Sequence, residues 1–70
     1  MIKELRIKNK YTQDAMAEEL QISLRNYVRI DNEQIIPRPD IFAKLIKTLD
    51  MNKAQIGEFV SNVLKNKGLL

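Results

Sequence analysis

The chain of 70 residues contains no cysteine, histidine or tryptophan, and only two glycines and two prolines. Without Cys and His, a cysteine nucleophile, a histidine general base and the common zinc sites are excluded. Nothing in the cysteine content indicates an oxidising compartment. No apolar run approaches the length of a membrane span, and residues 1–4 lack the apolar stretch of a signal peptide. We therefore expect a soluble cytoplasmic protein with no membrane partner.

The remaining composition indicates a small binding domain rather than an enzyme. Seventy residues allow one domain and leave no room for a second, effector-binding one. The sequence has no glycine-rich phosphate loop, and the neighbouring carboxylates Glu18 and Glu19 would diverge on a helix. We predict no enzymatic activity, no metal and no cofactor. The net charge of +3 is compatible with binding phosphates but does not establish it.

Apolar spacing and capping signals predict five short helices around one core. Thr12 and Ser23 are good N-caps, and Asn52 with Gln55 forms a capping-box pattern. Gly68 is a stop signal for the last helix. The expected helices cover roughly residues 2–9, 13–20, 24–31, 39–50 and 53–65. We expect a domain over residues 1–65 and a short C-terminal tail over residues 66–70.

The faces of these helices separate a core from an outer surface. In the helix over residues 24–31, Tyr27 and Ile30 point inward, whereas four residues fall on the outer side: Leu24, Arg25, Val28 and Arg29. In the last helix the apolar stripe is longer than core closure needs. Ile56 and Phe59 are expected to close the core, and the rest of the stripe is a possible contact with a second copy or another partner: Val60, Val63 and Leu64.

Residues 12–32 carry most of the functional information. They read as two short helices joined by a tight turn, with a capping serine at the start of the second. Helix-turn-helix DNA-binding domains use this layout to place the second helix in the major groove. An arginine on that helix can donate two hydrogen bonds to guanine, which makes Arg25 and Arg29 candidates for base readout, although Arg25 could equally contact phosphate. The outward Leu24 and Val28 could pack on thymine methyl groups or contact a protein.

An ordered set of residues over about four-fifths of the chain matches a known family. The set comprises Leu5-Arg6, Thr12-Gln13, Met16-Ala17, Leu20, Ile22-Ser23, the run from Arg29 to Asn32, Pro37, and Leu45 to Leu49. In this pattern the sequence resembles the Cro/C1-type (XRE, lambda-repressor-like) helix-turn-helix family of phage and bacterial regulators.

The resemblance implies an all-α, five-helix fold in which the second and third helices form the motif, and it implies roles for single residues. Base readout would come from the start and outer face of the third helix: Leu24, Arg25, Asn26 and Arg29. Contacts to the DNA backbone would come from Gln13 and Asn32. Independently of the resemblance, Ser23 and the basic Arg38 are further candidates for contacts to the DNA backbone. Arg6 and Asp31 would form a structural ion pair that orients the third helix.

Two positions depart from the family pattern. The turn that usually carries glycine has Gln21, and a left-handed backbone at a residue with a Cβ costs about 1 kcal/mol. The family glycine after Asn32 is replaced by Glu33. The charge of Glu33 is expected to lie close to DNA phosphates.

Two functions remain open from the sequence. The first is a sequence-specific transcriptional regulator, a small phage- or mobile-element-type repressor that binds a double-stranded operator as a homodimer and acts by occupancy. The alternative is a protein-interaction module, an antirepressor or antitoxin-like protein that binds another regulator through the same surface. The outward Leu24, Val28 and Ile7, together with Glu33, keep this alternative open.

Overall fold

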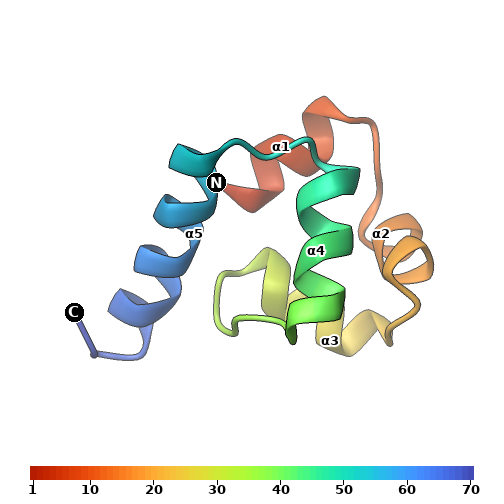
Figure 1. Ribbon diagram of the computed structural model, residues 1–70. Helices are drawn as coiled ribbons and strands as arrows, with labels where there is room; N and C mark the ends of the chain where they lie inside the picture. Colours follow the sequence, from red (N-terminus) through yellow and green to blue (C-terminus); the bar gives the residue numbers. More distant parts are fainter.

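The computed structural model describes residues 1–70 and contains five α-helices and no β-strand. The helices are α1 (Ile2–Lys8), α2 (Gln13–Leu20), α3 (Leu24–Asp31), α4 (Pro39–Thr48) and α5 (Lys53–Asn66) (Figure 1). The all-α, five-helix architecture predicted from the sequence is confirmed. α1 and α4 end one and two residues earlier than predicted, and α5 ends one residue later.

The helices begin where their capping residues predict. The Thr12 and Ser23 hydroxyls each accept a hydrogen bond from the backbone N–H three residues further on, at 3.0 and 3.1 Å. Asn52 and Gln55 form the predicted capping box, each side chain accepting from the other's backbone N–H. Pro39 is the first residue of α4, where its missing N–H costs nothing. These local bonds satisfy backbone donors that the first helical turn leaves free.

All five helices end in the same backbone motif. A residue with a left-handed backbone follows each helix, and its N–H donates to the carbonyl three residues back. The N–H of the next residue donates to the carbonyl five residues back, which completes a Schellman motif. The left-handed residues are Lys10, Gln21, Glu33, Asp50 and Gly68. Only the last is glycine, so four of these helix ends carry the strain of a Cβ in this conformation.

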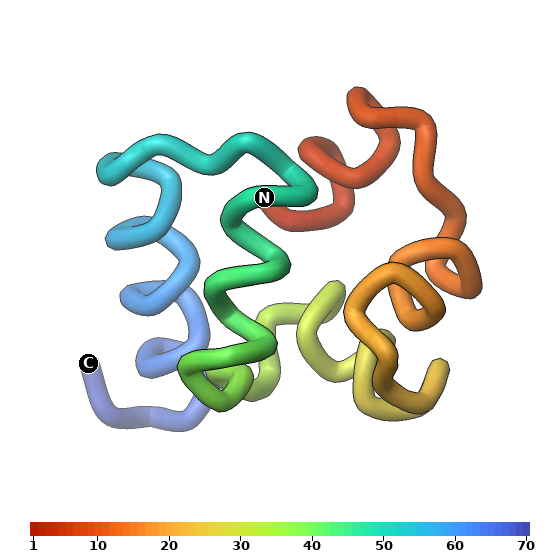
Figure 2. Tube along the Cα trace, turned by 45° about the vertical axis from the view of Figure 1, so that its right-hand side comes forward, coloured from red at the N-terminus to blue at the C-terminus, as the bar shows by residue number.

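The core takes side chains from every helix. Its fully buried members include Ile2, Met16, Tyr27, Leu45 and Phe59. α2 packs mainly against α3 and also against α4, and α1 packs on α3. Figures 1 and 2 both show α5 and α2 on opposite sides of α4. This arrangement covers one side of α3 and leaves its other side on the surface.

The structure corrects the interpretation of the apolar stripe on α5. Val63 has no exposed surface, so the prediction that it contacts a partner is wrong. It follows the buried Phe59 by one turn, which places both side chains on the inward face of the helix. Val60 and Leu64 are half-buried and keep part of their surface. Asn66, which the sequence placed in the tail, is the last residue of α5 and donates a hydrogen bond of 2.8 Å to the Glu33 carbonyl.

Candidate nucleic-acid interface

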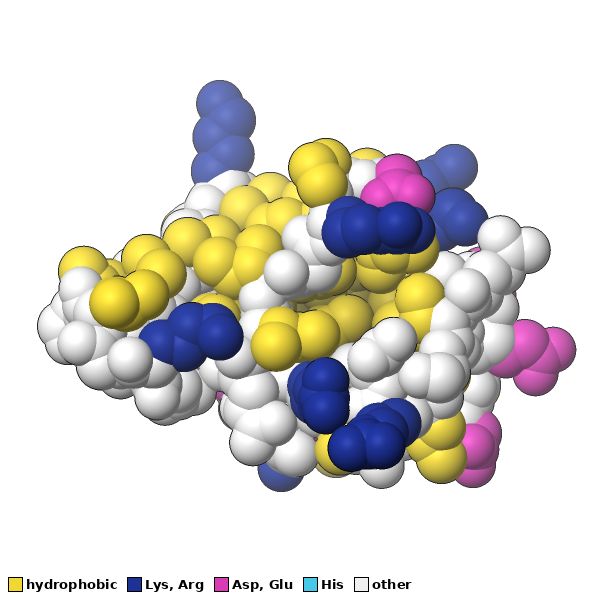
Figure 3. All heavy atoms as spheres, turned by 90° about the horizontal axis from the view of Figure 1, so that it is seen from below, with side chains coloured by type: hydrophobic (Ala, Val, Ile, Leu, Met, Phe, Trp, Pro, Cys, Tyr) yellow, Lys and Arg dark blue, Asp and Glu magenta, His cyan; other side chains and the backbone are white.

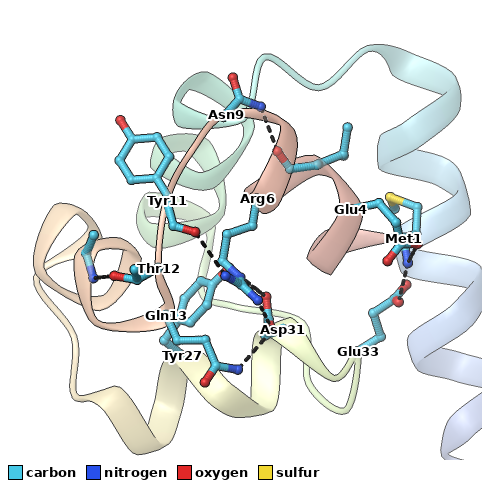
Figure 4. Close-up of polar contacts among 12 residues, drawn as sticks. Met1, Glu4, Arg6, Asn9, Tyr11, Thr12, Gln13, Tyr27, Asp31 and Glu33 are labelled. Carbon is cyan, nitrogen blue, oxygen red and sulfur yellow. Dashed lines mark hydrogen bonds and ion pairs between the residues drawn. The ribbon is translucent and has the colours of Figure 1, made fainter.

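The last residue of α3, Asp31, is the centre of a buried polar cluster (Figure 4). Its carboxylate is 1% exposed and accepts hydrogen bonds from three side chains. Arg6 donates from Nε at 3.0 Å and from Nη2 at 3.4 Å, and Gln13 Nε2 donates at 3.0 Å. The Tyr27 hydroxyl donates at 3.0 Å. The predicted ion pair between Arg6 and Asp31 is therefore present, with two further donors that the sequence did not indicate.

This cluster fixes α3 relative to the two helices before it. Arg6 lies on α1 and Gln13 opens α2, so one carboxylate ties three helices together. Arg6 Nη1 also donates to the Tyr11 carbonyl at 2.9 Å, which holds the segment between α1 and α2. No buried side-chain nitrogen or oxygen lacks a partner. Burial, together with the charge of Asp31 and the hydrogen bond to it, raises the pKa of the Tyr27 hydroxyl, so the phenol stays protonated and remains a donor.

The opposite face of α3 is open to solvent. Arg25, Asn26 and Arg29 are exposed, and the Leu24 side chain, at the first residue of the helix, is also exposed. Tyr27, as predicted, lies in the core. Val28 is half-buried, so part of its side chain reaches the surface. The four residues predicted to read bases are therefore all accessible to a ligand.

Two of the residues predicted to contact the DNA backbone also make hydrogen bonds within the fold. The Gln13 amide nitrogen donates to Asp31, which orients the side chain and leaves its carbonyl oxygen and a second N–H. The Ser23 oxygen accepts the capping bond, so its O–H proton remains to be donated. Both side chains therefore keep hydrogen-bonding groups that a ligand can bind.

The other two residues predicted to contact the DNA backbone lie in the segment between α3 and α4. Asn32 follows α3 directly and is exposed. Arg38 precedes α4, and its side chain is 77% exposed, in a loose pair of 3.5 Å with Asp40. Because both partners of that pair are exposed, it holds Arg38 only weakly.

A groove joins the surface of α3 to the start of α4. It has a volume of about 470 Å³, and both Asn26 and Arg38 line it. Its apolar walls come from five further residues: Ile30, Ile35, Ile36, Pro37 and Ile41. Figure 3, which looks at the side where α3 and α4 begin, shows an apolar hollow flanked by Lys and Arg side chains. The groove is thus lined both by Asn26, a candidate for base readout, and by Arg38, a candidate for contact with the DNA backbone.

The Glu33 carboxylate is bound by groups within the fold. One carboxylate oxygen accepts a hydrogen bond of 3.1 Å from the Met1 ammonium, and the other accepts one of 2.9 Å from Asn62 on α5. The Glu33 side chain is only 14% exposed. Burial alone would lower the pKa of the Met1 ammonium, but hydrogen bonds to Glu4 and Glu33 raise it. Neighbouring groups therefore enclose the Glu33 charge and partly neutralise it.

No group of three or more acidic, histidine or cysteine side chains is placed to hold a metal ion. None of the five helices has both the length and the apolar content to cross a membrane.

Comparison with known proteins agrees with this geometry. Residues 1–56 match the profile of a family described as a helix-turn-helix domain. No curated protein and no solved structure gives a significant match. The matched residues include α1 to α4, with the Asp31 cluster and the exposed face of α3. The match therefore agrees with the resemblance seen in the sequence, and the chain belongs to the Cro/C1-type helix-turn-helix family of DNA-binding domains.

Proposed function

We propose that this protein is a sequence-specific transcriptional regulator that binds double-stranded operator DNA with α3 in the major groove. The observation that carries the proposal is the two-sided character of α3. One side is fixed by Tyr27, Ile30 and Asp31, while the other presents two arginines and an asparagine to solvent. A rigid helix with exposed bidentate donors is what readout of guanine and adenine edges requires.

The contacts to the DNA backbone would come from the groups that flank α3. Ser23 lies at its start, Asn32 at its end, and Arg38 across the groove from Asn26. Gln13, held by Asp31, presents its remaining amide groups at the start of α2. Contacts from these residues to the DNA phosphates would not distinguish one base from another. They would set the register of α3 on the duplex.

We further propose that the protein binds its operator as a homodimer and represses by occupancy, as small regulators of phages and mobile elements do. Two partly exposed apolar side chains support the dimer: Val60 and Leu64 on α5 are half-buried. A twofold dimer would present two copies of α3 to half-sites about one helical turn apart.

Selection of binding sites from random duplex DNA tests this function. The purified protein is incubated with the library at two salt concentrations, and bound DNA is sequenced. We expect an enriched palindrome with half-sites about 10 base pairs apart, and weaker binding at the higher salt because neutralised phosphates release counterions. Absence of enrichment with folded protein contradicts the proposal.

One observation favours the second candidate, a module that binds another regulator. Ile7 on α1 is 64% exposed, and Leu24 is 43% exposed, so two large apolar side chains lie open on the surface. Glu33 no longer supports this alternative, because its carboxylate is bound within the fold. A protein-interaction module would give no enriched DNA site and would form a stoichiometric complex with a larger regulator.

A further inference from the structure

Leu24 has no structural task that explains its exposure. α3 is held in the fold by Tyr27, Ile30 and Asp31, all of them buried. The first turn of the helix is capped by Ser23, whose oxygen accepts from the Asn26 N–H at 3.1 Å. Neither the core nor the cap uses the Leu24 side chain, which is 43% exposed. Leu24 is also absent from the partly buried apolar side chains that pack against the core.

The place of Leu24 indicates what the side chain meets. It is the first residue of α3, next to the exposed Arg25 and two residues from the exposed Asn26. Residues at the start of a recognition helix contact base edges. Apolar atoms lie among the Lys and Arg side chains on the face where α3 begins (Figure 3). Within a DNA-reading surface, an apolar side chain gains most from contact with an apolar feature of the DNA.

Only one base presents such a feature in the major groove. Guanine, adenine and cytosine offer hydrogen-bond donors and acceptors there, whereas thymine adds a C5 methyl group. Resting on the function proposed above, we infer that Leu24 is a specificity-determining residue that packs on a thymine methyl group, so each half-site contains a thymine read by shape and apolar contact. Arg25, Asn26 and Arg29 supply the hydrogen bonds to neighbouring bases.

The test uses the operator obtained by selection and replaces each thymine in turn with deoxyuridine. This change removes the C5 methyl group and leaves base pairing intact. Loss of one buried methyl contact is expected to weaken binding about fourfold at one thymine position in each half-site. With the Leu24→Ser variant, the same substitution should have no effect, because the methyl group has lost its partner.

Two controls separate this inference from its alternatives. Arg25→Ala is expected to lower affinity but keep the fourfold preference for thymine over deoxyuridine. Circular dichroism and thermal unfolding check that Leu24→Ser folds, which its exposure predicts. If no site is selected at all, the DNA-binding function itself fails. If a site is selected but deoxyuridine never weakens binding, or weakens it equally in Leu24→Ser, the role of Leu24 is overturned while the function stands.

Discussion

The Tyr27 hydroxyl donates a hydrogen bond of 3.0 Å to the carboxylate of Asp31, one turn further along α3. Both side chains are buried, and the same carboxylate also binds Arg6 from α1 and Gln13 from α2. A single acidic group therefore receives every polar contact that joins the recognition helix to the helices before it. We therefore expect the position of α3 to depend strongly on this charge.

Replacing Asp31 with Asn tests that dependence. The amide cannot neutralise Arg6, and its NH₂ group would face donors that now lack an acceptor. Breaking a buried ion pair by removing one partner costs about 3 kcal/mol of unfolding free energy or more. Urea unfolding followed by circular dichroism measures the loss. The matched control is Asp14→Asn, at an exposed position in the first turn of α2, where we expect less than about 1 kcal/mol. Equal losses in the two variants would contradict the structural role of Asp31.

The raised pKa of Tyr27 predicts a specific loss of stability in alkali. Burial and the neighbouring Asp31 raise the pKa in the folded state above the ordinary value of about 10. Below that pH the Tyr27 hydroxyl is protonated in both the folded and the unfolded protein, so it does not change the unfolding free energy. Above it the unfolded chain loses the proton first, so the unfolding free energy falls by up to about 1.4 kcal/mol per pH unit.

Tyr27→Phe isolates this effect from the titration of lysines. The variant should lose about 1 kcal/mol at neutral pH through its missing hydrogen bond. Between about pH 9 and 11, its unfolding free energy should then decline less steeply than that of the unaltered protein. Urea unfolding at several pH values measures both slopes. Parallel slopes would show that Tyr27 does not titrate differently on folding.

Helix limits could be predicted from the sequence because their causes are local. Thr12, Ser23 and Asn52 each cap a helix through bonds to residues three positions away. The Arg6–Asp31 pair was predicted from the family resemblance. The bonds from Gln13 and Tyr27 to the same carboxylate were not, although Tyr27 and Asp31 have the i, i+4 spacing of neighbours on one helix face.

The surroundings of Glu33 and Val63 could not be predicted, because they depend on α5. Glu33 follows α3 with a left-handed backbone, and only the packing of α5 brings Asn62 to its carboxylate. Val63 lies on an apolar stripe that the sequence alone could not divide into an inward and an outward part. Its burial depends on how α5 is rotated against the rest of the core, which local patterns do not specify.

The left-handed residue after α1 offers a simple gain in stability. Lys10 has a φ of 64°, is exposed, and completes the Schellman motif through its backbone alone. Lys10→Gly removes the clash of the Cβ and should raise the unfolding free energy by about 1 kcal/mol. For a domain of this size, that corresponds to a rise in melting temperature of about 4–8 °C. Lys10→Ala, which keeps the Cβ, should bring no gain.

Glu33→Gly is expected to behave differently although its backbone is similar, with a φ of 56°. Glycine relieves the same strain but removes the carboxylate that binds Met1 and Asn62. The two effects are of comparable size, about 1 kcal/mol each, and opposite in sign. Thermal unfolding should therefore show a clearly smaller rise than for Lys10→Gly, or a fall. An equal rise would mean that the bonds to α5 and the N-terminus contribute nothing to stability.

Replacement of Arg29 with Ala tests base readout by α3. Arg29 is exposed near the end of the helix and is not needed for the Asp31 cluster, so the fold should be unaffected. If Arg29 donates two hydrogen bonds to guanine, the variant loses about 1–3 kcal/mol of binding free energy and accepts other bases at one position. If it contacts only phosphate, affinity falls uniformly across sequences. The slope of log binding constant against log salt concentration then becomes shallower by about 1. Lys53→Ala removes the same charge at the start of α5, at the opposite end of the molecule from the start of α3 (Figure 1), and should leave specificity unchanged. Binding titrations on the selected operator and on its single-base variants distinguish these outcomes, and unchanged affinity and specificity in Arg29→Ala would remove this arginine from the interface.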